Sequence, residues 1–288
     1  MKDLRKCILI IIVLALIASI VALSVNIIRS KVDKKANPVV TMEVEGYGTI
    51  KIELYPDKAP NTVKNFIKLA QRGYYDGKTF NDIEEGLIRA GLIETTGEDG
   101  TVTEEGPKLS NLKDLSEGEN DKSYSTKGEF IENGFDNTLS HQKGVISMYR
   151  TTSGKYQQEI SMVELMGYSD YVDTLIKEMY NSQSGGFFIV TEDSPQYDGL
   201  FTAFGKVTDG MDVVEAISNT EVKKETSENG EENETTSPVN PPVITKVTVD
   251  THGVDYGMPE TADTFDFDAI FNMFMQNYMQ SSSQTTSY

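Results

Sequence analysis

Residues 46–80 read GYGTIKIELYPDKAPNTVKNFIKLAQRGYYDGKTF, and this stretch predicts a strand, a corner, a helix and a turn in close succession. Apolar and polar residues alternate over 50–55, which is typical of a strand with one buried face. Pro60 suits the first turn of a helix, where its missing N–H group costs nothing. Apolar residues then recur over 63–70 at the spacing of one helical face, and Gly73 is placed to end the helix.

Short strands are also predicted on both sides of this stretch. Residues 40–44 alternate in the same way, and the turn at 45–48 joins them to the next strand as a β-hairpin. Further strands are predicted at residues 145–150, 187–191, 201–207 and 241–250, and a short helix at 211–219. We therefore expect residues 39–250 to form one mainly β domain.

Four segments depart from the strand pattern. Segment 94–126 is rich in Glu, Gly, Ser, Thr and Asp, and predicts a long polar loop inserted into the domain. Segment 151–186 carries an apolar stripe and predicts an inserted helical hairpin or one helix kinked near Gly167. Segment 221–238 is acidic and Ser/Thr-rich, which is typical of a mobile loop, and 251–288 is a tail that contains an amphipathic helix.

Two of these segments are candidate partner sites. The stripe in 151–186 could form a lid or bind a protein of the cell envelope, although packing on the domain itself is the simpler interpretation. The tail helix, within 265–280, could dock on the domain, on an envelope protein or on the outer membrane surface, and the sequence favours none of these.

The net charge of the chain is −19 over 288 residues, and it is unevenly distributed. The first 35 residues carry +5, so the remainder carries −24. Such an acidic body would be repelled by phosphate backbones, which excludes nucleic acid as a partner.

Residues 7–25, CILIIIVLALIASIVALSV, form an uncharged run long enough to cross a bilayer as a helix. We expect a short tail at 1–6, a transmembrane signal-anchor at 7–28 and a linker at 29–38. The chain is then a single-pass protein of the cell membrane whose domain faces the extracytoplasmic side. A cleaved signal peptide is the alternative, although the apolar run is longer than a usual signal core.

No signature of cofactor or metal binding occurs in the sequence. Cys7 is the only cysteine, so an intramolecular disulfide is impossible. His141 and His252 are the only histidines, and one histidine without nearby companions does not build a metal site. We expect neither a cofactor nor a metal.

Several further blocks follow the opening stretch in order: KGEF with ENGF (127–135), GVISM (144–148), FFI (187–189), YDG (197–199), FGKV with DGMDVV (204–214) and PPVI (241–244). Together with 46–80, this set resembles the cyclophilin-type peptidyl-prolyl cis-trans isomerases over 39–250, outside the insertions. The resemblance implies a closed, antiparallel eight-stranded β-barrel capped by two helices. It also implies that proline-containing polypeptides bind in a groove on the outside of the barrel.

The resemblance also assigns residues to that groove. Its substrate-binding side chains would be Phe80, Leu87, Ile88, Tyr149, Phe187, Phe188, Tyr197 and Phe201. The family's catalytic Arg, which donates toward the prolyl nitrogen as the amide loses its conjugation, falls on Asp82. An ionised Asp cannot make that hydrogen bond.

Arg89 is a possible substitute for the missing Arg. If one residue is deleted after Gly86, Arg89 matches the family's substrate-binding Gln; without the deletion Ala90 takes that position, and Arg89 faces the other side of the strand. The family's Ser-Gln pair before FFI is replaced by Gly185-Gly186. We therefore expect a weak isomerase that acts on exported chains, and the alternative is a non-catalytic proline-peptide-binding or chaperone module of the cell envelope.

Overall fold

The hairpin predicted at the start of the domain is present, formed by β1 (Val39–Val44) and β2 (Gly48–Leu54) in antiparallel register. The coordinates are a computed structural model that describes residues 36–96, 102–226 and 232–285. The chain divides into two units, Met1–Asn37 and Pro38–Tyr288, and the described helices and strands all belong to the second unit. The predicted transmembrane segment 7–28 lies outside the described residues, and within those residues no helix has the length and apolar character needed to cross a membrane.

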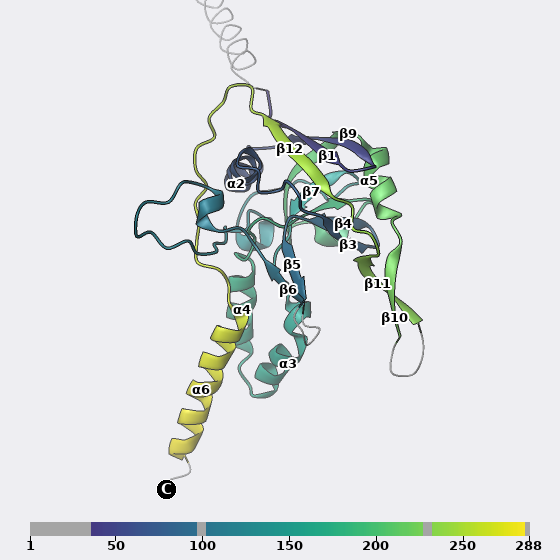
Figure 1. Ribbon diagram of the computed structural model, residues 1–288. Coiled ribbons are helices and arrows are strands. Elements are labelled where there is room, and N and C mark those ends of the chain that lie inside the picture. Colours follow the sequence, from purple (N-terminus) through teal and green to yellow (C-terminus); the bar gives the residue numbers. More distant parts are fainter. Residues whose placement is uncertain (1–35, 97–101, 227–231, 286–288) are drawn as a thin grey trace, which may run out of the picture. The chain divides into compact units, whose positions relative to one another are not determined.

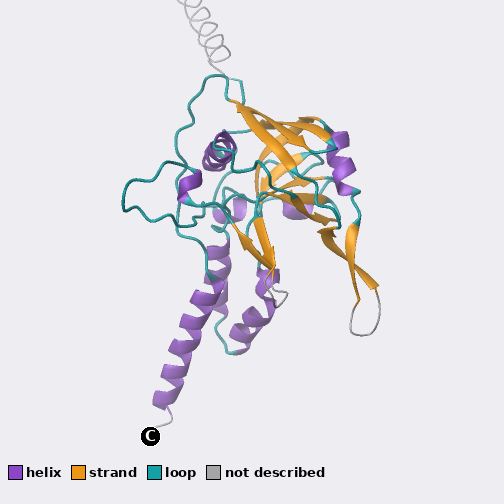
Figure 2. Cartoon of the chain, in the orientation of Figure 1, coloured by secondary structure: helices purple, strands orange, loops and turns teal. Residues whose placement is uncertain are grey.

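Eight strands form one antiparallel sheet that curls into a half-barrel (Figures 1 and 2). Its order is β12-β1-β2-β9-β7-β8-β4-β3. Besides the first hairpin, its members are β3 (Phe80–Glu84), β4 (Leu87–Ala90), β7 (Val145–Met148), β8 (Phe187–Val190), β9 (Thr202–Asp209) and β12 (Ile244–Asp250). The predicted strands at 145–150, 187–191, 201–207 and 241–250 are thereby confirmed, with slightly different ends.

The prediction of a closed barrel is wrong. The end strands β3 and β12 form no ladder with each other, and the residues before them share only the isolated bridge between Thr79 and Val243. Pro241 and Pro242 precede β12, and proline has no N–H group to donate to a ladder. The hydrogen bond from Phe80 N to the Pro242 carbonyl, at 2.9 Å, is one of the few that join these ends.

Two helices pack against the sheet as predicted. In α2 (Pro60–Gln71), Pro60 lies in the first turn, and Gly73 follows the helix with φ of +72°. Phe66 of α2 is fully buried against Phe187 and Phe204, with ring centroids 5.8 and 5.3 Å away, at the centre of the main core. The shorter α5 (Met211–Ser218) buries Val214 and Ile217 in the same core.

The two polar segments contain more structure than the sequence predicts. Segment 94–126 is not only a loop, because β5 (Ile93–Thr96) and β6 (Val102–Glu105) pair as a hairpin. The acidic segment likewise contains a hairpin, formed by β10 (Val222–Thr226) and β11 (Glu232–Pro238). Both hairpins are built mostly from polar residues, so no apolar period marks them in the sequence.

The segment at 151–186 is a helical hairpin, the first of the two predicted alternatives. Helices α3 (Gln157–Leu165) and α4 (Ser169–Met179) are separated by Gly167, whose φ of +87° suits the turn. The predicted tail helix is also present as α6 (Phe267–Thr285), which extends beside α4 in Figure 1.

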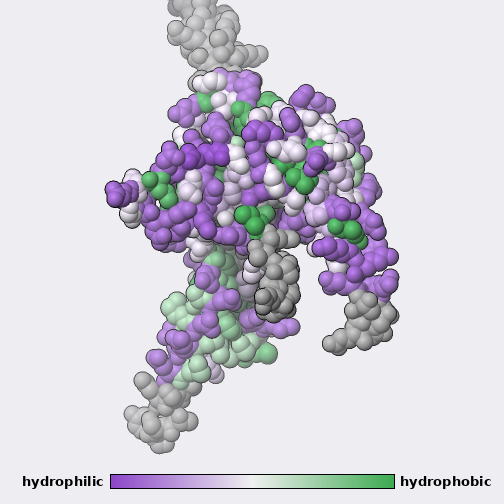
Figure 3. All heavy atoms as spheres, in the orientation of Figure 1, coloured by the Kyte–Doolittle hydropathy of each residue, from purple (hydrophilic) through white to green (hydrophobic). Residues whose placement is uncertain are grey.

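These three helices build a second apolar core that is distinct from the core of the sheet. Its buried members are Ile160, Val163, Val172, Leu175, Met179, Phe267 and Phe274. Phe274 of α6 stacks on Tyr171 of α4 at 4.6 Å, so the tail docks on the chain's own inserted hairpin. In Figure 3 the lower part of the molecule, where this helical region lies, shows a broad area of pale green, whereas the rest of the face is mostly hydrophilic with small green patches.

Candidate active site

The register of β4 decides which side chains reach the outer face of the sheet. Leu87 packs beside Phe188 in a cluster on the outer face, whereas Ile88 and Ala90 lie in the main core. Arg89 is paired across the strands with Phe188 on one side and with Asp82 on the other. Because side chains alternate along a strand, Arg89 shares the outer face with Leu87, which corresponds to the alignment with one deletion after Gly86.

Aromatic side chains on this outer face enclose a cavity of about 230 Å³, which we call the aromatic cavity. Phe188, Tyr197 and Phe201 stand edge to face, with centroids 5.4–5.7 Å apart. The cavity is lined by Glu84, Leu87, Arg89, Tyr149, Thr152, Phe188, Tyr197 and Phe201. Five of the eight substrate-binding candidates are thus brought together, and Arg89 joins them.

The other three candidates, Phe80, Ile88 and Phe187, are not in the cavity. Each is fully buried in the main core, on the opposite face of its strand. Period-two alternation explains this placement, since Phe187 and Ile88 are sequence neighbours of cavity residues and must point the other way.

Arg89 is the centre of a buried ion-pair network at the polar end of the aromatic cavity. Its Nε and Nη2 donate to the same oxygen of Asp82, at 2.7 and 2.5 Å, and its Nη1 donates to Glu104 of β6. The side chains of Arg89 and Asp82 are each only 9% exposed. Each terminal nitrogen carries a second N–H group, which is the kind of donor that a ligand in the cavity would need.

The surroundings of Arg89 stabilise its charge. Burial works against the charged form, but the carboxylates of Glu104 and Asp82 more than offset it, so the pKa of Arg89 is raised. The guanidinium carbon also lies 4.3 Å from the centroid of the Tyr149 ring, a cation–π arrangement. Burial raises the pKa of Tyr149 to about 12, although Arg89 opposes this, so the phenol is neutral beside the guanidinium.

A hydrogen-bond chain through the buried His141 and Ser147 adjoins Phe188. His141 stacks on Phe188 at 6.0 Å, and its two ring nitrogens lie 3.0 Å from Asp198 Oδ1 and 2.7 Å from Ser147 Oγ. Ser147 is fully buried, so this Ser-His-Asp arrangement offers no nucleophile to a substrate. Burial lowers the pKa of His141 despite Asp198, which is consistent with a neutral, structural imidazole.

The Gly185-Gly186 pair has a steric reason. A Cβ on Gly186 would lie 2.8 Å from Leu92, and one on Gly185 would lie 2.8 Å from the Tyr74 ring. Both neighbours therefore occupy space that the family's Ser-Gln pair would need.

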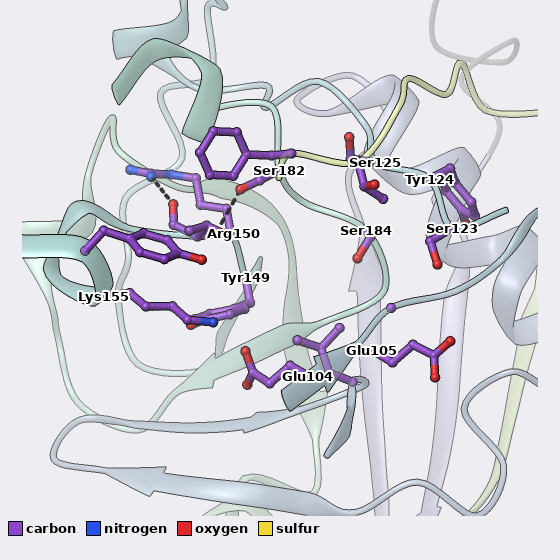
Figure 4. Close-up of a pocket in the computed structure, with 16 residues that line it drawn as sticks. Glu104, Glu105, Ser123, Tyr124, Ser125, Tyr149, Arg150, Lys155, Ser182 and Ser184 are labelled. Carbon is purple, nitrogen blue, oxygen red and sulfur yellow. Dashed lines mark hydrogen bonds between the residues drawn. The ribbon is translucent and has the colours of Figure 1, made fainter. Parts of the chain in front are cut away.

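A second, more polar hollow of about 330 Å³ adjoins the aromatic cavity and shares Tyr149 with it. Figure 4 shows Glu104 and Glu105 on one wall of this hollow, with Arg150 and Ser182 on the opposite side. Much of its wall comes from the two inserted segments 94–126 and 151–186 and from the C-terminal tail. Sequence reasoning missed Glu84, Glu104 and Thr152 because they lie outside the blocks that carry the family resemblance.

Comparison with known proteins identifies the architecture. The family model described as cyclophilin type peptidyl-prolyl cis-trans isomerase matches residues 39–165 and 174–249. The chain belongs to the cyclophilin-type peptidyl-prolyl cis-trans isomerase family. This cyclophilin is 31% identical over 183 residues to peptidyl-prolyl cis-trans isomerase B of Bacillus subtilis, covering 63% of the chain and 92% of that relative.

A second relative agrees with this assignment. Peptidyl-prolyl cis-trans isomerase-like 1 of Rhizopus delemar is 32% identical over 172 residues, which is 59% of this cyclophilin and 74% of the relative. Among solved structures, a cyclophilin-type isomerase of Cryptosporidium parvum matches with a TM-score of 0.47 and 20% identity, covering 74% of this chain and 97% of the other.

Proposed function

We propose that this cyclophilin is a peptidyl-prolyl cis-trans isomerase in which Arg89, rather than a residue at position 82, supplies the catalytic guanidinium. The observation that carries the proposal is the presence of Arg89 in the lining of the aromatic cavity, opposite Phe188. Isomerisation breaks no bond and must overcome a barrier of roughly 18–20 kcal/mol set by amide resonance. An apolar seat for the proline ring and one donor aimed at its nitrogen are enough for the chemistry.

The same geometry leads us to propose weak activity. Asp82 takes the position of the family's Arg. Asp82 and Glu104 both accept hydrogen bonds from Arg89, so they compete with a substrate for its N–H groups. A donor already bound to two carboxylates gives up part of those contacts when it turns to the prolyl nitrogen. Transition-state stabilisation is therefore smaller than for a guanidinium free of carboxylate partners.

The ion pairs of Arg89 also support the alternative function. If the two carboxylates hold the guanidinium permanently, the aromatic cavity remains a site for proline-containing segments without catalysing their isomerisation. The chain would then act as a binding or chaperone module of the cell envelope.

We further propose that residues 7–28 anchor the chain in the cell membrane and that the domain acts on exported proteins. The uncharged run over 7–25 supports this topology. Proline-containing polypeptides are the proposed partners of the aromatic cavity, and an envelope protein is a further candidate for 151–186 or 265–280.

A protease-coupled isomerisation assay on the purified full-length chain tests the main proposal. We expect catalysis of an Ala-Pro peptide that is strongly reduced in Phe188→Ala, whose ring lines the cavity. Catalysis should be retained in Phe271→Ala, which removes a ring packed against the second core instead. If the wild-type protein binds the peptide but does not accelerate its isomerisation, the isomerase proposal is wrong and the alternative binding function is supported.

A further inference from the structure

The aromatic cavity carries more negative than positive charge at its polar end. Asp82, Glu84 and Glu104 surround the single guanidinium of Arg89, and Asp82 and Glu104 are both engaged by it. Glu84 lies in the cavity lining and forms no ion pair with any Lys, Arg or His of the described residues. One carboxylate therefore faces the cavity without a partner cation.

Two further observations show that this negative charge is not neutralised locally. Oδ1 of Asp82 is buried and has no hydrogen-bond partner among the described residues. Burial, followed by the charge of Asp82, raises the pKa of Glu84; a side-chain interaction with Asp82 adds to this rise, and Arg89 opposes it. The carboxylate of Glu84, which lines the cavity, is an acceptor that a positively charged ligand would satisfy.

Nearby cations outside the network do not alter this balance. Arg150 stacks on Phe201 at 4.8 Å, but it does not line the aromatic cavity, and its guanidinium donates to the backbone carbonyls of Leu200 and Thr151. Lys155 lines the adjoining hollow, not the cavity. Glu84 is thus the charged group of the cavity that remains available to a substrate side chain.

We infer that the aromatic cavity prefers proline-containing segments in which a residue next to the proline is Lys or Arg, with Glu84 as the acceptor of that side chain's positive charge. The inference rests on the proposed function, because it assumes that the proline ring enters between Phe188, Tyr197 and Phe201. The apolar walls select the ring, and the carboxylate at the rim selects the sign of the neighbouring charge. A Glu or Asp beside the proline meets Glu84 with like charge, which disfavours binding.

The expected preference is modest because Glu84 is partly exposed to solvent. Ion pairs of this kind contribute about 0.2–1 kcal/mol, which corresponds to a preference of roughly 1.4- to 5-fold for Lys over Ala. The preference for Lys over Glu should be larger, since repulsion adds to the lost attraction. Both should shrink as the salt concentration rises.

The test uses the full-length chain and peptides that carry Lys, Ala or Glu before or after one proline, measured both by binding and by protease-coupled isomerisation. We expect affinity and kcat/KM to fall in the order Lys, Ala, Glu on at least one side of the proline. Glu84→Gln should bring the Lys-to-Glu ratio toward one. The matched control Glu85→Gln, one residue further along in the exposed turn and outside the cavity lining, should leave that ratio unchanged.

The outcomes separate this inference from the proposed function. Equal turnover of all three peptides would overturn the charge preference and leave the isomerase intact. Binding in the expected order without any turnover would overturn the isomerase and leave the preference intact. A ratio that changes equally in Glu84→Gln and Glu85→Gln would show that net charge, not Glu84, sets the selectivity.

Discussion

Arg89→Ala is the most informative single change, because it removes the proposed donor and the partner of two carboxylates at once. Losing one preorganised donor costs about 2.7–4 kcal/mol of transition-state stabilisation in well-studied sites, a factor of roughly 10²–10³ in rate. The same change leaves Asp82 and Glu104 without their cation, and breaking a buried ion pair costs about 3–5 kcal/mol of folding stability. For a domain of this size, that loss lowers the melting temperature by roughly 6–20 °C.

The two effects are separated by a second variant. In Asp82→Asn/Arg89→Gln the buried Asp charge is removed together with the guanidinium, so most of the stability should return while the activity stays lost. Protease-coupled isomerisation and thermal unfolding of wild type, Arg89→Ala and the double variant complete the test. Wild-type kcat/KM in a folded Arg89→Ala protein would refute the assignment of Arg89 as the donor.

Four other outcomes are expected. Asp82→Arg/Arg89→Gln restores the residue types that the family resemblance implies at these positions, and its activity in the isomerisation assay should exceed that of wild type. Asp82→Arg alone should add little activity because Arg89 still occupies the site. Glu84→Gln should stabilise the protein increasingly above about pH 4.3, as measured by pH-dependent unfolding curves. The pKa of Glu84 is raised in the folded state, so the wild type loses stability as the pH rises from the unfolded pKa through the folded pKa, and the variant does not. Leu175→Ala should destabilise the second core by about 2–5 kcal/mol in denaturant unfolding, with isomerase activity unchanged below the transition. Protease added to intact cells should digest residues 36–288. Digestion only after lysis would show that the domain does not face the outside of the cell.

The parts of the fold that sequence analysis predicted are those specified by local periodicity. The β1–β2 hairpin, α2 and the helices of 151–186 are each marked by apolar spacing and by Gly or Pro at their ends. The open end of the sheet was not predicted, because it depends on whether β3 and β12, which lie far apart in the sequence, form a ladder with each other after Pro242.

The candidate site was predicted in its apolar half and left open in its polar half. Phe188, Tyr197 and Phe201 follow from blocks whose register is fixed by their neighbours. The face of Arg89 depends on one residue in the turn before β4, and a single-residue slip reverses every side chain of that strand. Glu104 could not be found at all, since it reaches Arg89 from a polar hairpin without an apolar pattern.

The second core has a consequence for synthesis of the chain on the ribosome. Helices α3 and α4 are made midway, yet the rings that complete their core, Phe267 and Phe274, belong to α6 near the end. Strand β1 likewise waits for β12, more than 190 residues later, to pair along its second edge. The sheet therefore stays incomplete until β12 has emerged, and the second core until α6 has emerged. Such non-local contacts make folding slow. A nascent chain of this cyclophilin must be kept from aggregating until its C-terminus is released.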